Sequence, residues 1–278
     1  DRVVYDAADS RILGGSGTDT LVFSRAQLSD PLTDLTTVAG TQVSNFEKLD
    51  LGNSGAVKLD EAAVLALCDT GRVTVLGTTG SALSLYGGWV YVGIESDATG
   101  AMFKVLQKGS AFVSVADGVT LNVANELGEP IQVGTATADS ITVGALQGAM
   151  AGDGDDVITV NNMSFAGVDG GRGTDTVRFD FSGSNINGAG RINTSILAPT
   201  GLTNIEVFDM TYRSSVEPTS NTYNELILTP EKVAEMTDSN KLLIVKGTPN
   251  YDSLTLYGDW TLTGNVVYNG VAYSSAQG

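Results

Sequence analysis

The sequence predicts a mainly β protein made of two tandem β-rich modules, each with one short helix, joined by a short parallel β-roll. Three observations predict it. The 278 residues include 34 glycines, which separate many short apolar runs. Blocks of the first half recur in the second half in the same order. A short glycine–aspartate pattern is repeated in the middle of the chain, and a repeat of fixed period is typical of stacked architectures.

The middle of the chain, residues 134–179, contains the repeated pattern. Residues 152–158 read G-D-G-D-D-V-I and residues 170–178 read G-G-R-G-T-D-T-V-R, while residues 134–143 keep only the leading glycine and the D-S-I end. The key aspartates Asp139, Asp156 and Asp175 are 17 and 19 residues apart. A further copy, G-G-S-G-T-D-T-L-V, occupies residues 14–22. These segments follow the nonapeptide G-G-x-G-x-D-x-U-x, in which U is apolar.

Each repeat predicts a tight turn of six residues and a short strand whose U residue faces inward. Glycine permits the positive φ values and close backbone approach that such a turn needs. A coil of two nonapeptides has about 18 residues, which matches the spacing of the aspartates. We therefore expect Asp139, residues 152–156 and residues 169–175 on one side of a small roll.

Carboxylates and glycine carbonyls together indicate a calcium site. Calcium takes 6–8 oxygen ligands of both kinds. One turn supplies about half of such a shell, so an ion needs two stacked turns. We expect a calcium-binding parallel β-roll with one Ca²⁺ in each of the two gaps. The opposite side, residues 144–148 and 161–167, has glycine without carboxylates, and we expect no ion there.

Composition narrows the function classes. The chain has 32 acidic and 15 basic residues, no histidine and a formal charge of −17. Such a charge argues against a nucleic-acid partner, because phosphates are neutralised by Lys and Arg. Bound cations would offset part of the self-repulsion. No apolar run approaches the roughly 20 residues of a membrane span. The single cysteine, Cys68, is expected to be a small buried residue.

The two halves align block by block, which indicates a tandem duplication. Residues 14–23 match 170–179, 43–51 match 202–210, 59–69 match 228–238 and 83–89 match 254–260. The predicted domains are a first module at 1–124, a linker and calcium roll at 125–178, and a second module at 179–278. The chain starts without Met, which predicts a fragment of something longer.

Local signals place the elements of a module. Thr229-Pro230-Glu231 predicts a helix start, with Val233 and Met236 facing inward. Asp60-Glu61 predicts the equivalent helix, with Val64 and Leu67 inward. Residues 73–76 and 242–245 read as buried strands. Residues 91–92, 103–106, 112–115 and 119–123 read as antiparallel strands.

The second module has no counterpart of the 119–123 strand. A neighbouring chain could supply it by strand addition. Alternatively, the ordered region simply ends there.

No enzyme signature is present. The absence of histidine excludes a Ser-His-Asp triad, a Cys-His pair and an H-E-x-x-H zinc site. Trp89 and Trp260 could be sugar platforms, although packing roles are favoured at such repeated positions. The Asn-x-Glu motifs Asn45/Glu47 and Asn204/Glu206 could ligate a cation, with a structural role favoured. We expect a protein that is not an enzyme.

The nonapeptides, together with the block from (V/L)-(S/T)-N-(F/I)-E to L-x-L-Y-G-(G/D)-W, resemble RTX adhesin modules and related type I-secreted bacterial surface proteins. The resemblance implies calcium held by aspartates and by glycine carbonyls of the turns. The residues it implies are Asp19, Asp153, Asp155, Asp156, Asp169, Asp175, Gly15, Gly152, Gly154, Gly171 and Gly173. Asp139 and Gly17 are further expected metal-site residues, and Asp6 and Asp9 are expected as substitute ligands in the degenerate coil before Gly14.

The resemblance also implies a secreted protein that folds outside the cell, at the bacterial surface. The sequence thus favours a non-enzymatic calcium-binding structural segment that becomes rigid in extracellular calcium. One alternative is a surface-layer or filament subunit that binds copies of itself or neighbouring modules. Another is an adhesin module that binds a cell-surface glycan or a protein.

Overall fold

The computed structural model describes residues 1–23, 32–180, 191–193, 201–211, 224–238, 242–248 and 252–278. The described residues form mainly β-strands with two short helices, so the predicted mainly β class with short helices is confirmed. Contacts within the chain divide it into two compact units, Asp1–Ala136 (unit 1) and Thr137–Gly278 (unit 2). Their boundary lies inside the segment predicted as linker and roll.

Unit 1 contains two sheets of mainly parallel strands, in the orders β1-β3-β6-β8-β12-β11-β10 and β14-β13-β9-β7-β4, with β2 and β5 as a separate pair. The strands are β1 (Arg2–Val4), β2 (Ile12–Leu13), β3 (Thr20–Val22), β4 (Thr33–Asp34), β5 (Val43–Ser44), β6 (Lys48–Asp50), β7 (Ala56–Leu59), β8 (Arg72–Leu76), β9 (Ala82–Tyr86), β10 (Val90–Ser96), β11 (Met102–Lys108), β12 (Ala111–Ala116), β13 (Thr120–Ala124) and β14 (Pro130–Val133). The chain alternates between the two sheets, from β6 to β7 and from β8 to β9, so that side chains of both sheets fill the space between them.

Strand pairing in unit 1 differs from the sequence prediction at two places. The pairs β10–β11 and β11–β12 are antiparallel, as predicted. However, β12 also pairs with β8 in parallel, and β13 pairs with β9 in parallel. β12 therefore lies between β8 and β11, and β13 lies between β9 and β14. An antiparallel hairpin can be predicted because its two strands are close in the sequence. Pairing with a strand some 40 residues earlier cannot, because it does not change the local pattern of apolar residues.

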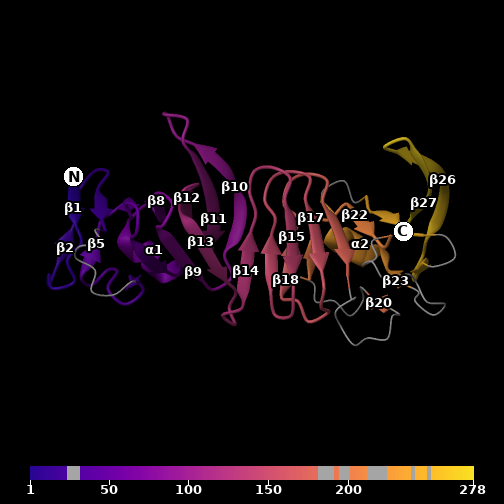
Figure 1. The fold of residues 1–278 in the computed structure, drawn as a ribbon, viewed down its shortest axis with the longest axis horizontal. Helices are drawn as coiled ribbons and strands as arrows, with labels where there is room; N and C mark the ends of the chain where they lie inside the picture. The colour runs from indigo at the N-terminus through magenta and orange to yellow at the C-terminus, as the bar shows by residue number, and fades with distance from the viewer. Residues whose placement is uncertain (24–31, 181–190, 194–200, 212–223, 239–241, 249–251) are drawn as a thin grey trace. The chain divides into compact units, whose positions relative to one another are not determined.

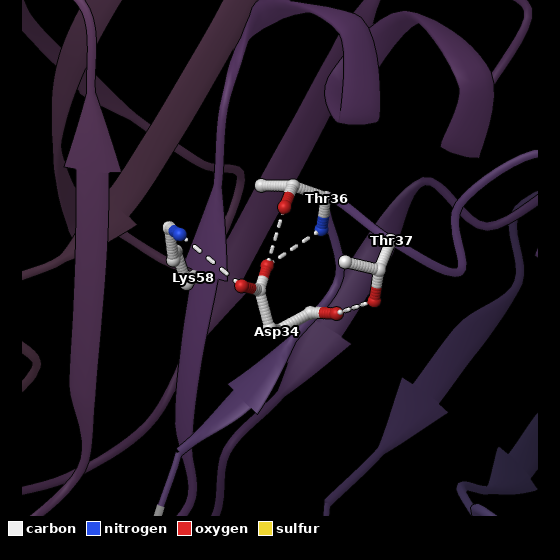
Figure 2. A network of polar contacts seen from close by, with 4 residues as sticks. All are labelled: Asp34, Thr36, Thr37 and Lys58. Carbon is white, nitrogen blue, oxygen red and sulfur yellow. Dashed lines mark hydrogen bonds and ion pairs between the residues drawn. The ribbon is translucent and has the colours of Figure 1, made fainter.

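A polar network fixes the edge strand β4 in unit 1 (Figure 2). The Asp34 carboxylate accepts hydrogen bonds from the Thr36 amide (3.0 Å) and hydroxyl (2.5 Å), and pairs with Lys58 Nζ on β7 at 3.1 Å. Thr37 donates its hydroxyl to the Asp34 carbonyl. Burial raises the pKa of Asp34, but the Thr36 and Lys58 contacts outweigh it and the net pKa is lowered. Lys58 is thus a cation from the chain itself that neutralises the Asp34 carboxylate.

Unit 2 begins with parallel strands that alternate between two sheets along the chain. One sheet has the order β15-β17-β19-β22-β24, and the strands β16, β18 and β21 belong to the other. Figure 1 shows β15, β17 and β22 with the same direction. The remaining strands form the sheets β20-β23-β25 and β26-β27. The strands are β15 (Ser140–Val143), β16 (Gly148–Met150), β17 (Val157–Val160), β18 (Gly167–Asp169), β19 (Thr176–Phe179), β20 (Arg191–Asn193), β21 (Leu202–Thr203), β22 (Val207–Asp209), β23 (Asn224–Leu228), β24 (Ile244–Lys246), β25 (Asp252–Leu256), β26 (Thr261–Tyr268) and β27 (Val271–Gln277).

The core of unit 2 lies between these parallel strands. The U residues Ile158 and Val177 are fully buried, and Ile141 is nearly so. They pack in one cluster with Ala149 and Val168 from the other sheet. The predicted inward position of the U residue is therefore confirmed, and Leu21 of the first copy is fully buried as well. The strand predicted at 242–245 is shifted, because β24 begins at Ile244.

The two helices form where their capping signals lie. In α1 (Glu61–Leu67) the Asp60 side chain accepts the amide of Ala63, and Val64 and Leu67 are buried. In α2 (Pro230–Met236) Thr229 caps the amide of Lys232, Pro230 takes the first position and Met236 is buried. Val233 is partly buried against the core. Both predicted helix starts are confirmed. Cys68, which follows α1, is buried as expected.

Matched blocks of the two units make the same local contacts. Trp89 is buried and donates Nε1–H to the Tyr86 carbonyl at 3.1 Å, and Trp260 makes the same bond to Tyr257 at 3.0 Å. Because the indole of Trp89 is buried in its own module, its role is packing rather than binding a sugar. Phe46 donates its amide to the last residue of α1, and Ile205 does the same with α2.

Candidate metal centre

A line of carboxylates runs across the parallel strands of unit 2. The Asp139 amide donates to Asp156 Oδ1 (2.7 Å), the Asp156 amide to Asp175 Oδ1 (2.9 Å), and the Asp175 amide to Glu206 Oε2 (2.9 Å). We call these four residues the carboxylate ladder. The side chains of Asp156, Asp175 and Glu206 each hold the backbone of the preceding turn, so adjacent turns are joined by a charged acceptor, which strengthens a hydrogen bond.

The ladder follows from the strand register. Ser140 pairs with Val157, and Val157 pairs with Thr176, so the residues just before β15, β17 and β19 are aligned. Those residues are the three key aspartates of the repeat. The predicted neighbourhood of Asp139, Asp156 and Asp175 is therefore present, with bonding through backbone amides.

The inner aspartates are almost completely buried. Asp156 is 1% exposed and Asp175 is 0% exposed. Oδ1 of each accepts an amide, whereas Oδ2 of each is buried without a hydrogen-bond partner. Burial is the largest cause that raises the pKa of Asp156 to about 6, and neighbouring carboxylates add to it. Burial likewise raises the pKa of Asp175 to about 7, with contributions from Asp156 and Glu206.

Glu206 ends the ladder, and sequence reasoning did not place it in the site. Asn204 adopts a left-handed conformation (φ 52°) that turns the chain and lets Glu206 reach back to Asp175. Burial also raises the pKa of Glu206. In unit 1, Asn45 (φ 61°) and Glu47 hold the Asp19 amide at 2.8 Å in the same way. The Asn-x-Glu motif thus makes the same structural contact in both units. Its recurrence was the signal that could have placed Glu206 here.

Glycines allow the two complete turns to stack. Gly171 (φ 94°) and Gly173 (φ 146°) lie against the carbonyl oxygens of Gly152 and Gly154, where any side chain would overlap these oxygens. Such contact is open only to glycine. Arg172 donates its amide to Gly152 O at 2.8 Å. The stacked glycines thus bring the backbones of the two turns into direct contact.

The other predicted aspartates of the central turns have mixed roles. Asp155 Oδ1 accepts the Thr174 amide (2.8 Å) of the next turn. Asp153 Oδ1 is buried without a hydrogen-bond partner. Asp169 accepts the Gly171 amide (3.1 Å) and the side-chain amide of Asn204 (2.7 Å). Asp153 therefore has an oxygen to offer a cation, whereas Asp155 and Asp169 bond partly within the protein.

The turn in unit 1 differs from the central pair. Asp19 is 2% exposed, Oδ1 pairs with the amino group of Asp1 at 2.6 Å, and Oδ2 is buried without a partner. No described atom lies against Gly15 or Gly17, so no stacked turn covers them. Both Asp6 and Asp9 are exposed. Asp6 accepts the amide of Ala8 in its own turn, so its recorded contact is local.

Carboxylates alone do not make a complete metal site here. In the part of the chain that the structure describes, no three Asp, Glu, His or Cys side chains are grouped as a metal would need. Calcium also accepts carbonyl oxygens, and the expected ions would therefore depend on the glycine carbonyls of the stacked turns. Asp153, Asp156 and Asp175 each keep one buried oxygen without a hydrogen-bond partner, so each has a charged ligand to offer, although the three are not grouped around one point.

Comparisons of the chain with protein families, with curated proteins and with solved structures find no match. The resemblance to RTX modules thus remains a prediction from the motifs. No described helix is long and apolar enough to cross a membrane.

We expect Gly170→Ala to destabilise unit 2. A Cβ at Gly170 would overlap the Asn204 carbonyl and lie 2.6 Å from the Cβ of Asp175. Asp175 is held by the ladder, and the Asn204 side chain is held by Asp169. Overpacking of this kind costs about 1–3 kcal/mol. Urea denaturation would measure the loss.

The matched control is Gly144→Ala, where a Cβ meets only side-chain ends, the nearest being Gln147 Oε1 at 3.0 Å. Equal stabilities of the two variants would contradict the close approach at Gly170.

Proposed function

We propose that the chain is a non-enzymatic, calcium-binding structural segment of a secreted bacterial surface protein. The observation that carries the proposal is the pair of buried carboxylates Asp156 and Asp175, each with one oxygen fixed by an amide and the other without a partner.

Buried carboxylates of this kind need compensation. An unpaired buried charge is costly, so the group either takes up a proton or binds a cation. Asp34 has Lys58 as its cation (Figure 2). Among the described residues, no basic side chain forms an ion pair with Asp156 or Asp175. The ladder therefore favours a cation from solution.

Calcium is the cation that suits these ligands. It is a hard ion that takes carboxylate and backbone oxygens in flexible geometry. Asp156, Asp175 and Asp153 would supply charge, with no more than two of these carboxylates on one ion, and the carbonyls of Gly152 and Gly154 would supply neutral oxygens. When bound, calcium would neutralise the carboxylates and join adjacent turns. The amide bonds to Oδ1 hold each carboxylate in place and leave Oδ2 for the ion.

Coupling of ion binding to folding is the proposed mechanism. With a formal charge of −17, the metal-free chain repels itself, most strongly where acids are clustered. A ligand that binds only the folded state stabilises it by mass action. The scarce calcium of the cytosol would leave the turns loosely joined, and calcium outside the cell would make them rigid.

Calcium titration of the chelator-treated chain tests the proposal. We expect saturable heat in calorimetry and slower amide hydrogen exchange across residues 139–179 once calcium is added. Magnesium, which prefers a strict octahedral shell and keeps its waters, should give much weaker protection. Identical exchange and identical melting temperature in calcium and in excess EGTA would overturn the proposal.

A further inference from the structure

Glu206 holds both backbone polar groups of Asp175. Its Oε2 accepts the Asp175 amide at 2.9 Å, and its own amide donates to the Asp175 carbonyl at 3.1 Å. These two bonds fix the backbone from which the Asp175 side chain extends. Oδ1 of that side chain accepts the Asp156 amide, and its buried Oδ2 has no hydrogen-bond partner. The position of this oxygen therefore depends on Glu206.

The other carboxylate oxygen of Glu206 is bonded at the end of α2. Oε1 accepts the amide of Asp238, two residues after the helix ends, at 3.4 Å. The preceding residue adds a second link, because the Ile205 amide donates to the Met236 carbonyl at 2.8 Å. The Glu206 carbonyl accepts the Ile244 amide of β24 at 2.7 Å. One residue thus joins the carboxylate ladder to a helix end and to a strand.

Unit 1 contains the same construction. Glu47 Oε2 accepts the Asp19 amide at 2.8 Å, and the residue before it, Phe46, donates its amide to Leu67 at the end of α1. The Glu47 carbonyl accepts the Thr74 amide of β8 at 2.8 Å. Since these contacts recur in two units, the link between a buried aspartate, a helix end and a strand is a property of the Asn-x-Glu motif.

The two carboxylates differ in what they offer a cation. Both oxygens of Glu206 accept backbone amides, whereas Asp175 keeps one buried oxygen without a hydrogen-bond partner. Glu206 is therefore suited to position a ligand rather than to be one. Burial raises the pKa of Asp175 most, and the charge of Glu206 raises it further. The two groups thus repel each other when both are ionised, and buried charges are screened little by salt.

We propose that Glu206 is a positioning residue of the cation site and that it couples cation binding at Asp175 to the end of α2. An ionised Asp175 without a cation repels Glu206 and weakens its bonds to the two amides. A cation on Asp175 removes this repulsion, so that Glu206 holds the Asp175 and Asp238 amides together. In the proposed function, on which this inference rests, calcium is that cation.

Amide hydrogen exchange of the full chain in saturating calcium and in excess EGTA tests the coupling. In the unsubstituted chain, calcium should slow exchange of the Asp238 amide about tenfold or more. Glu206→Gln has a single acceptor oxygen, which serves one of the two amides at a time. In this variant calcium should still protect residues 139–179 but slow the Asp238 amide less than about threefold. A Glu206 with only a structural role would change exchange by the same factor with and without calcium.

Two further variants separate the coupling from other effects. Glu235→Gln is the matched control, because it removes the same charge on α2 itself, where Glu235 pairs with Lys232. It should leave the response of the Asp238 amide to calcium unchanged. Asp175→Asn in EGTA removes the repulsion without any metal and keeps an acceptor for the Asp156 amide. It should therefore slow Asp238 exchange relative to the unsubstituted chain in EGTA.

Calcium protection of residues 139–179 without protection of Asp238 would overturn the coupling and leave the calcium site in place. Protection of Asp238 by calcium that persists in Glu206→Gln would overturn it as well. If calcium protects neither segment, the proposed function is contradicted, and the Asp175→Asn result decides the role of Glu206. Slower Asp238 exchange in that variant supports the coupling, and unchanged exchange overturns it.

Discussion

The melting temperature of the metal-free protein is expected to fall as the pH is raised from 5 to 8. Folding raises the pKa of Asp175 to about 7 and that of Asp156 to about 6, mainly through burial. An unfolded Asp has a pKa of about 3.9. The folded state thus binds these protons more tightly than the unfolded state, and its stabilisation is complete only below about pH 4. This stabilisation is lost as the pH rises through the folded-state pKa values, about 6 for Asp156 and about 7 for Asp175.

Calcium should reverse the sign of this dependence. The ion binds the ionised carboxylates, so protons compete with it and its affinity rises with pH. Scanning calorimetry in EGTA and in millimolar calcium at several pH values would measure both slopes. A flat metal-free profile would contradict the burial of the ladder. If the melting temperature falls with pH and calcium does not change this dependence, the burial of the ladder is supported and the proposed calcium site is contradicted.

The local fold was predictable because its signals are local. The glycine–aspartate nonapeptide sets a turn and a short strand, which correctly placed Leu21, Ile158 and Val177 in the interior. The capping residues Asp60 and Thr229 mark the helix starts. Each of these elements depends on residues within a few positions of one another, and the sequence shows them directly.

Long-range pairing was not predictable in the same way. β12 reads as an antiparallel hairpin strand, and nothing in it indicates the parallel partner β8. The same limit applied to the ladder. The spacing of the aspartates predicted that they would be neighbours. In Asp175, Oδ1 accepts an amide and Oδ2 has no hydrogen-bond partner. This difference depends on how closely two turns stack, which only the structure shows.

Asp175→Asn should separate the structural role of the ladder from metal binding. Asparagine keeps an Oδ1 that can accept the Asp156 amide, and it replaces the unpartnered Oδ2 with an uncharged NH₂ group. Without metal at pH 8 we expect the variant to melt no lower than the unsubstituted chain, because the buried charge is gone. Its stability should also depend less on pH.

In millimolar calcium the order of stability should reverse. The variant lacks a charged ligand between two turns, so calcium should raise its melting temperature far less than that of the unsubstituted chain. Asp209→Asn is the matched control, since it removes the same charge at a side chain that bonds Thr211 outside the ladder. Equal stabilisation by calcium of the unsubstituted chain and the Asp175 variant would place the ion elsewhere. In that case, the buried Oδ2 atoms would be proton acceptors alone.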